Sequence, residues 1–281
     1  MSAALPRGAG APGLAIVTGA SSGIGWHVAR ELLARGMQVL AIARDAQRLE
    51  AARAALGAGY HPVALDVREG PRLEAACAAA IARHGPPRWA VACAGVARPG
   101  RFLDLPAVEH ARAMETNYLG SVHLARACLP AMARAGEGRL VLVSSAAALA
   151  TFYGFSAYSP SKAALRALGD VLALEMAAHG VTVTTVFPPD TDTPQLRDEL
   201  AHRPAVTRAY LGANAPLAAA FVARALLRGA AAGRRHLAIG AGPRFLLAWP
   251  WLCDILGRRR QQRLATALAR EERMGLRGEA R

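Results

Sequence analysis

Lysine is nearly missing from this sequence of 281 residues. Of its 34 basic residues 33 are arginines, and the remaining one is Lys162. Codon composition accounts for a general arginine preference. A position that retains lysine against that preference can need an amine, because ammonium and guanidinium differ in shape and acidity. Lys162 is therefore the first candidate functional residue.

Three further absences limit the class of protein. The four cysteines form no CxxC pair, and the eight histidines are dispersed, so we expect buried thiols in a reducing compartment, no disulfide frame and no metal site. No apolar run reaches the roughly 18 to 20 residues of a membrane-spanning helix. The first 15 residues lack the basic start and apolar run of a secretory signal. A cytoplasmic location is expected.

Positive charge is concentrated at the C-terminus. The formal net charge is +14, and residues 234–281 hold eleven arginines against four acidic residues, a net of +7. A basic end of this kind indicates a nucleic acid or an anionic membrane surface. Neither an RNA-stacking platform nor a recognition-helix motif is present, so no nucleic-acid partner is expected.

Short apolar runs alternate with alanine-rich segments of helical spacing. The runs cover residues 14–18, 38–43, 61–65, 89–93, 139–143, 181–187 and 236–239. Such alternation predicts right-handed βαβ units and one doubly wound parallel sheet of the Rossmann type, with about seven strands flanked by helices. We therefore divide the chain into a flexible leader (1–13), a sheet domain (14–242) with a lid at 188–211, and a basic amphipathic extension (243–281).

A glycine-rich segment, TGASSGIG at residues 18–25, follows the first predicted strand and opens a helix. Gly19 permits a tight turn, Gly23 lets the backbone approach a pyrophosphate, and Gly25 allows close helix packing. The free N–H groups of the helix N-terminus would face the anion. The loop residues expected to bind the cofactor are Thr18, Gly19, Ser21, Ser22, Gly23, Ile24 and Gly25.

The ends of the second and third predicted strands bear on the choice of dinucleotide. Arg44 occupies the position where a basic residue would meet a 2′-phosphate, which favours NADPH over NADH. Asp45, one residue later, is more simply the N-cap of the next helix. Asp66 is placed to bond the adenine amino group, or alternatively to cap the helix that follows.

The strongest catalytic signal is YSPSK at residues 158–162. Residues four apart share one face of a helix, so the Tyr158 phenol and the Lys162 ammonium would enter one site. The cation is expected to lower the pKa of the phenol, which would let it exchange a proton near neutral pH. Ser145, at the end of the fifth predicted strand, could hold a substrate carbonyl, and Asn117 could hold a water that links Lys162 to solvent.

Taken together, these residues resemble the short-chain dehydrogenase/reductase family over residues 14–240. The resemblance implies that Tyr158 is the acid, Lys162 its tuning cation, Ser145 the carbonyl anchor and Asn117 part of a proton relay. It also implies an NADPH cofactor and a homodimer or homotetramer. The further cofactor contacts implied by the resemblance are Val67, Ala94, Gly95, Pro188, Thr191 and Thr193.

A narrower resemblance is carried by PPDTDTP at residues 188–194, by residues 154–162 and by CAG at residues 93–95. These segments are similar to the 3-ketodihydrosphingosine (3-dehydrosphinganine) reductases, which implies reduction of the C3 ketone of a long-chain lipid in sphingolipid biosynthesis. Two alternatives remain open. One is a reductase of another lipophilic carbonyl, such as a steroid, a retinoid or a 3-ketoacyl compound, and the other is a noncatalytic dinucleotide-binding membrane adaptor.

The C-terminal extension begins with a mostly apolar segment, residues 245–256, that is too short to cross a bilayer. It holds Trp249 and Trp251 and precedes three consecutive arginines at 258–260. Tryptophan beside arginine fits an element in the headgroup region, which would make the protein peripheral on the inner face of a membrane. The alternative is a helix that docks on its own core or on a second subunit.

Overall fold

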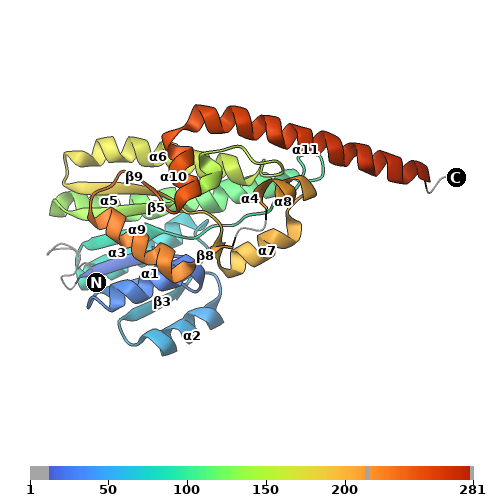
Figure 1. Cartoon of the computed structure of the whole chain (residues 1–281). Helices are drawn as coiled ribbons and strands as arrows, with labels where there is room; N and C mark the ends of the chain where they lie inside the picture. Colours follow the sequence, from blue (N-terminus) through green and yellow to red (C-terminus); the bar gives the residue numbers. More distant parts are fainter. Residues whose placement is uncertain (1–12, 213–214, 279–281) are drawn as a thin grey trace.

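The computed structural model describes residues 13–212 and 215–278, and a seven-stranded sheet forms its centre (Figure 1). Its strands are β1 (Leu14–Thr18), β2 (Gln38–Ala43), β3 (Tyr60–Ala64), β4 (Pro87–Ala92), β5 (Gly138–Val143), β6 (Val181–Phe187) and β9 (His236–Ala238). They pair in parallel in the order β3-β2-β1-β4-β5-β6-β9. The predicted doubly wound parallel sheet is confirmed.

Helices cover both faces of the sheet because alternate strand residues point to opposite sides. In β1, Ala15 and Val17 belong to one buried cluster, and Leu14 and Ile16 belong to another. The first cluster packs against α1 (Gly23–Leu33), α2 (Ala46–Leu56) and α9 (Ala219–Ala231). The second packs against α3 (Gly70–His84), α5 (Gly120–Ala135) and α6 (Tyr158–Ala177). Strands buried on both faces explain their nearly continuous apolar sequences.

The strand order reverses between β1 and β4. From β1 the chain builds outward through β2 to β3, then returns to place β4 on the other side of β1. The loops that follow β1 and β4 therefore separate at the carboxyl edge and leave a crevice, which is where ligands of open α/β sheets bind. The predicted glycine loop lies at this edge.

The predicted lid, residues 188–211, forms short elements above the same edge. It contains β7 (Thr191–Asp192), α7 (Pro194–His202) and α8 (Ala205–Leu211), and β7 pairs in parallel with β8 (Leu217–Ala218). The other short helices are α4 (Ala107–Ala113), the π-helical turn η1 (Met114–Leu119) and the 3₁₀ turn η2 (Ala146–Ala148).

The C-terminal extension folds into α10 (Ala241–Ala248) and α11 (Pro250–Gly278), and α11 projects beyond the sheet (Figure 1). At Gln261 α11 docks on the body: this side chain is 6% exposed, accepts from the Tyr153 amide at 2.6 Å and donates to the Thr151 carbonyl at 2.7 Å. Within the described ranges, no helix combines the length and the apolar character needed to span a membrane. Of the predicted leader, only Gly13 lies inside the described residues.

Candidate active site

The glycine loop joins β1 to α1 in a conformation that requires glycine. Gly19 and Gly23 have φ angles of +67° and +54°. A Cβ on Gly25 would lie 2.3 Å from the Gly19 carbonyl oxygen, and a Cβ on Gly19 would lie 2.8 Å from the Ala94 nitrogen. Thr18 also holds the end of β1 close to the loop after β4, because its hydroxyl accepts from the Ala94 amide at 3.2 Å. The loop is thus a narrow cradle at the N-terminus of α1.

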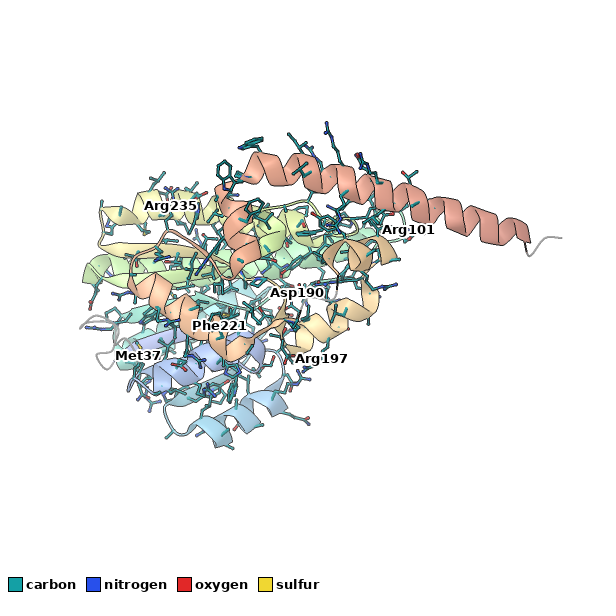
Figure 2. All side chains as sticks on the ribbon, viewed as in Figure 1. Met37, Arg101, Asp190, Arg197, Phe221 and Arg235 are labelled. Carbon is teal, nitrogen blue, oxygen red and sulfur yellow. The ribbon has the colours of Figure 1, made fainter. Side chains whose placement is uncertain are left out.

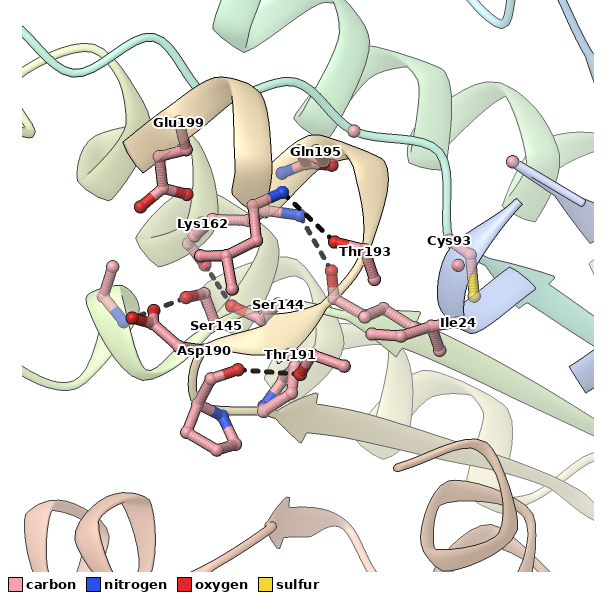
Figure 3. A pocket seen from close by; sticks show the side chains of 18 of the residues that line it. Ile24, Cys93, Ser144, Ser145, Lys162, Asp190, Thr191, Thr193, Gln195 and Glu199 are labelled. Carbon is pink, nitrogen blue, oxygen red and sulfur yellow. Dashed lines mark hydrogen bonds between the residues drawn. The ribbon is translucent and has the colours of Figure 1, made fainter. Parts of the chain in front are cut away.

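A cavity of about 1020 Å³ extends from this loop to the start of α6. Most of the sequence-predicted site residues line it, and Figure 3 shows part of its wall. These are Gly19, Ser21, Ser22, Gly23, Ile24, Gly25, Arg44, Asp66, Val67, Ala94, Gly95, Ser145, Tyr158, Lys162, Pro188, Thr191 and Thr193. Thr18 and Asn117 are not part of the lining and support the wall from behind.

Tyr158 and Lys162 occupy the first two turns of α6 and are 7% and 4% exposed. The Lys162 Nζ donates to the Val143 carbonyl oxygen at the end of β5, at 2.9 Å, and lies 5.7 Å from the centroid of the Tyr158 ring. Ser145, two residues after Val143, is within hydrogen-bonding reach of the Tyr158 hydroxyl. Hydroxyl, phenol and amine therefore share one wall of the cavity, as their spacing predicts.

The expected lowering of the Tyr158 pKa is wrong for this structure. Burial raises the pKa of the phenol well above its ordinary value of 10.0, nearby Glu199 adds to the rise, and the hydrogen bond with Ser145 opposes it only in part. The amine is affected instead, because burial lowers the pKa of Lys162 from 10.5 to about 8. Without a substrate, Tyr158 therefore keeps its proton throughout the neutral range.

Asn117 acts through contacts inside the protein. Its Oδ1 accepts from the Val96 amide at 2.8 Å, and its Nδ2 donates to the Val96 carbonyl at 3.0 Å and to the Ser161 hydroxyl at 2.9 Å. It sits in the π-helical turn η1, a distortion often found at functional sites. A Cβ on Gly95 would lie 3.1 Å from Asn117 Oδ1 and 3.4 Å from Lys162 Nζ. Asn117 thus holds the loop after β4 against α6, and its role in a water relay stays a prediction.

The acidic residues after β2 and β3 have separate tasks. Asp45 caps α2 by accepting from the Arg48 amide at 3.0 Å, as the sequence predicts. Asp66 accepts from the Arg68 amide at 3.0 Å and from its guanidinium at 2.9 and 3.0 Å, so it does not cap α3. Burial tends to raise the pKa of Asp66, but these bonds outweigh it and hold the pKa below its ordinary value.

The beginning of the lid is tied to the glycine loop and to β5. The Pro188 carbonyl accepts from the Ala146 amide at 3.0 Å. Thr193 caps α7, accepting from the Leu196 amide at 3.2 Å, and its methyl group would lie 2.9 Å from a Cβ on Gly23. These contacts close the cavity over the glycine loop.

Comparison with known proteins agrees with this arrangement. Residues 13–204 match the short chain dehydrogenase family. The chain belongs to that family. It is therefore an oxidoreductase, and its fold binds a nicotinamide dinucleotide.

Other members of the family resemble this short-chain dehydrogenase over most of its length. It is 35% identical to a 3-dehydrosphinganine reductase of Danio rerio over 69% of this chain and 60% of that protein. It is 34% identical to a 3-ketodihydrosphingosine reductase of Mus musculus over 80% of this chain and 70% of that protein. The crystal structure of a short-chain dehydrogenase from Streptomyces avermitilis superimposes with a TM-score of 0.75 at 28% identity, covering 94% and 98% of the two chains.

The residues present fit a dinucleotide. A Cβ on Gly19 or Gly25 would collide with backbone atoms of the cradle. Because glycine has no Cβ, the backbone of the loop can approach a pyrophosphate closely. The Ser22 side chain does not cap α1, so the first N–H groups of that helix remain available to an anion. The same cavity continues past Lys162 to Tyr158, so cofactor and substrate would meet there.

Three charged residues of the lid were missed by the sequence analysis. Asp190, Glu199 and Arg203 line the cavity and form an ion-pair group beside Tyr158, in which Glu199 and Arg203 are buried. The signal available in the sequence is the four-residue spacing of Glu199 and Arg203 on a helix, but nothing there joins them to Asp190. Figure 2 labels Asp190 toward the middle of the molecule and Arg197 of the same lid nearer its edge.

Proposed function

We propose that this short-chain dehydrogenase reduces the C3 ketone of 3-ketodihydrosphingosine to an alcohol, with NADPH as the reductant. The observation that carries the proposal is the meeting of Ser145, Tyr158 and Lys162 on the cavity wall that continues from the glycine cradle. The names of the relatives that share about a third of the sequence support the choice of substrate.

Each residue of that wall has a task in the reaction. Bound NADPH would supply the hydride for the ketone carbon. Ser145 would donate a hydrogen bond to the ketone oxygen, where negative charge develops. Tyr158 would give that oxygen its proton, a task suited to a phenol whose pKa burial holds above the neutral range. Lys162, whose amine is protonated below its pKa of about 8, would stabilise the phenolate left behind.

The preference for NADPH rests on Arg44. Its side chain is exposed at the end of β2 and lines the cavity, and Arg48 lines it nearby. Since the Asp45 carboxylate caps α2, Arg44 and Arg48 are the residues at the end of β2 that would meet the ribose, and they favour a 2′-phosphate. We expect Arg44→Asp to raise the KM for NADPH at least tenfold while that for NADH changes little. Equal effects on both cofactors would contradict the assignment.

A second cavity fits the alkyl chain of such a substrate. It measures about 1120 Å³ and shares Ala147, Phe152 and Phe155 with the first. It extends along the loop before α6 toward Trp251 at the start of α11. The transfer of each methylene from water to an apolar site is worth about 0.8 kcal/mol, so a long chain would favour this path strongly.

Delivery of a long-chain ketone requires contact with a membrane. Five large apolar side chains of α10, α11 and the residue between them are exposed by 40 to 62%: Phe245, Trp249, Trp251, Ile255 and Leu256. Three consecutive arginines follow at 258–260. Aromatic and apolar side chains beside arginines support adsorption to an anionic surface. Trp249→Ser with Trp251→Ser should weaken sedimentation of the full-length protein with anionic vesicles, whereas Phe221→Ser, 43% exposed on α9, should not. Equal binding by both variants would contradict the proposal.

A homodimer or homotetramer through the helices around Asn117 and Tyr158 is part of the same proposal. Val171 and Leu174 are 51% and 69% exposed on α6, which gives that helix an apolar outer face. Light scattering of the purified protein at several concentrations would test the oligomer, and a monomer throughout would refute it.

The decisive test of the reaction is NADPH oxidation with a short-chain 3-ketosphinganine analogue, followed by mass identification of the alcohol. Tyr158→Phe should abolish turnover while the protein still binds NADPH. Dinucleotide binding without turnover of any lipophilic ketone by the unmodified protein would favour a noncatalytic adaptor. Turnover of a steroid, retinoid or 3-ketoacyl compound alone would favour another reductase of the family.

A further inference from the structure

The lid places two carboxylates and one guanidinium in the substrate end of the cavity. Arg203 is 5% exposed and forms a bidentate pair with Asp190, with N–O distances of 2.7 and 2.8 Å. It also donates two hydrogen bonds to Glu199, at 2.6 and 2.9 Å. All three side chains line the cavity, and Figure 3 shows Asp190 beside Ser145 and Glu199 farther from it.

The charges of this group do not balance. Two carboxylates against one guanidinium leave a formal charge of −1. Glu199 is the buried carboxylate, since the Asp190 side chain is 41% exposed. Both hydrogen bonds that Glu199 accepts go to Oε1, so within residues 13–212 and 215–278 no donor reaches its Oε2. Glu199 is 7% exposed, and burial raises its pKa, which means that its charge is poorly compensated. A buried charge of this kind is stable only when it is paired.

The unbalanced charge lies close to the reacting centre. Glu199 and Asp190 both raise the pKa of Tyr158, while Arg203 lowers it, so all three are within electrostatic reach of the phenol. The group belongs to the lid, whereas the Lys162 amine donates to the Val143 carbonyl at the end of β5. A cation beside the ketone would be attracted by the carboxylates.

We propose that Glu199, positioned with Asp190 by Arg203, forms a subsite for the ammonium group of an amino ketone. This proposal rests on the proposed function and adds to it the feature by which the enzyme selects its substrate. The free Glu199 oxygen would accept a charge-assisted hydrogen bond from the ammonium next to the reacting carbonyl. The same charge would repel anionic substrates such as 3-ketoacyl thioesters with phosphate groups.

A purely structural role for the group predicts a different outcome. If Glu199 only clamps the lid through Arg203, its replacement weakens the binding of every ligand alike. If it recognises ammonium, only ligands with an amine are affected. Pairs of ligands that differ in the amine alone therefore separate the two roles.

The test uses calorimetric binding of octylammonium and of 1-octanol to the full chain saturated with NADP⁺. We expect the unmodified protein to bind octylammonium at least tenfold more tightly, since a hydrogen bond to a charged group contributes about 1.5 to 3 kcal/mol, or roughly a factor of 10 to 160. Glu199→Gln should reduce the preference to less than threefold and leave octanol binding unchanged. Asp192→Asn is the matched control, because Asp192 is 63% exposed in the same lid, pairs with Arg197 and lies outside the cavity lining.

If Glu199→Gln does not fold, Asp190→Asn is tested in its place, and it should likewise reduce the preference for octylammonium over 1-octanol. The proposal is overturned if the unmodified protein binds the two ligands equally, or if the folded variants keep its preference. Turnover is measured separately, with the 2-amino ketone and its deaminated counterpart. Glu199→Gln should raise the KM of the amino ketone and leave that of its deaminated counterpart unchanged. A clear ammonium preference without reduction of either ketone would refute the proposed function and leave the subsite standing.

Discussion

Replacement of Lys162 by methionine should reveal the cost of burying its charge. In the folded protein, burial lowers the pKa of Lys162 from 10.5 to about 8, and the side chain is 4% exposed. Between those two pH values the unfolded chain binds more protons than the folded chain, so the stability of the unmodified protein rises with pH. Well below pH 8 the amine is protonated in both states, so the stability no longer changes with pH through this group. Lys162→Met removes the titrating group and with it this dependence.

The magnitude follows from the shift. At pH 7, protonation of the buried amine costs about 3 kcal/mol relative to an amine with an ordinary pKa, and at pH 10 it costs about 1 kcal/mol. The variant also loses the hydrogen bond to the Val143 carbonyl, worth about 1 kcal/mol at every pH. We therefore expect Lys162→Met to be more stable than the unmodified protein by about 1 to 2 kcal/mol at pH 7. The difference should shift by about 2 to 3 kcal/mol against the variant by pH 10.

Urea unfolding of both proteins at pH 7, 8.5 and 10 would measure this difference, since the other titrating groups cancel. Leu165→Met is a suitable control because Leu165 is 1% exposed on the same helix and carries no charge. Its stability difference from the unmodified protein should stay constant with pH. A constant difference for Lys162→Met as well would refute the reasoning, because Lys162 would then have an ordinary pKa in the folded state. The reductase activity of Lys162→Met should be lost despite its stability.

Three other substitutions test the packing around the site. Gly25→Ala should abolish NADPH binding measured by fluorescence, because its Cβ would meet the Gly19 carbonyl at 2.3 Å; retained affinity would contradict a rigid cradle. Asn117→Ala should lower the free energy of unfolding by about 2 to 4 kcal/mol, since it leaves the partly buried Val96 amide and the buried Ser161 hydroxyl without the Asn117 side chain, and a loss below about 1 kcal/mol would show that water replaces it. Gln261→Ala should speed proteolysis within α11 without changing NADPH binding, and unchanged proteolysis would show that other contacts hold the helix.

The parts of the site that follow from local spacing were predicted. The segment 18–25 lies between a strand and a helix in the structure, and Tyr158 and Lys162 share one face of α6. These relations depend only on the geometry of a turn and of one helical turn. The cap formed by Asp45 and the position of Ser145 are equally local, since each residue follows the end of a strand.

The direction of the Tyr158 pKa shift could not be predicted in the same way. The sequence indicates a cation nearby, but the extent of burial depends on how the lid, β5 and α6 close around the phenol. Desolvation is larger here than the effect of the neighbouring charges.

By itself the sequence determined the doubly wound sheet, the glycine cradle and the pairing of phenol with amine, because hydrophobic periodicity and i, i+4 spacing act over short stretches of chain. Only the tertiary structure decided which charges meet across the cavity. Asp190 and Arg203 are thirteen residues apart and come together because the lid folds back over the sheet edge. Contacts of that kind depend on the path of the chain between them, which no local pattern specifies.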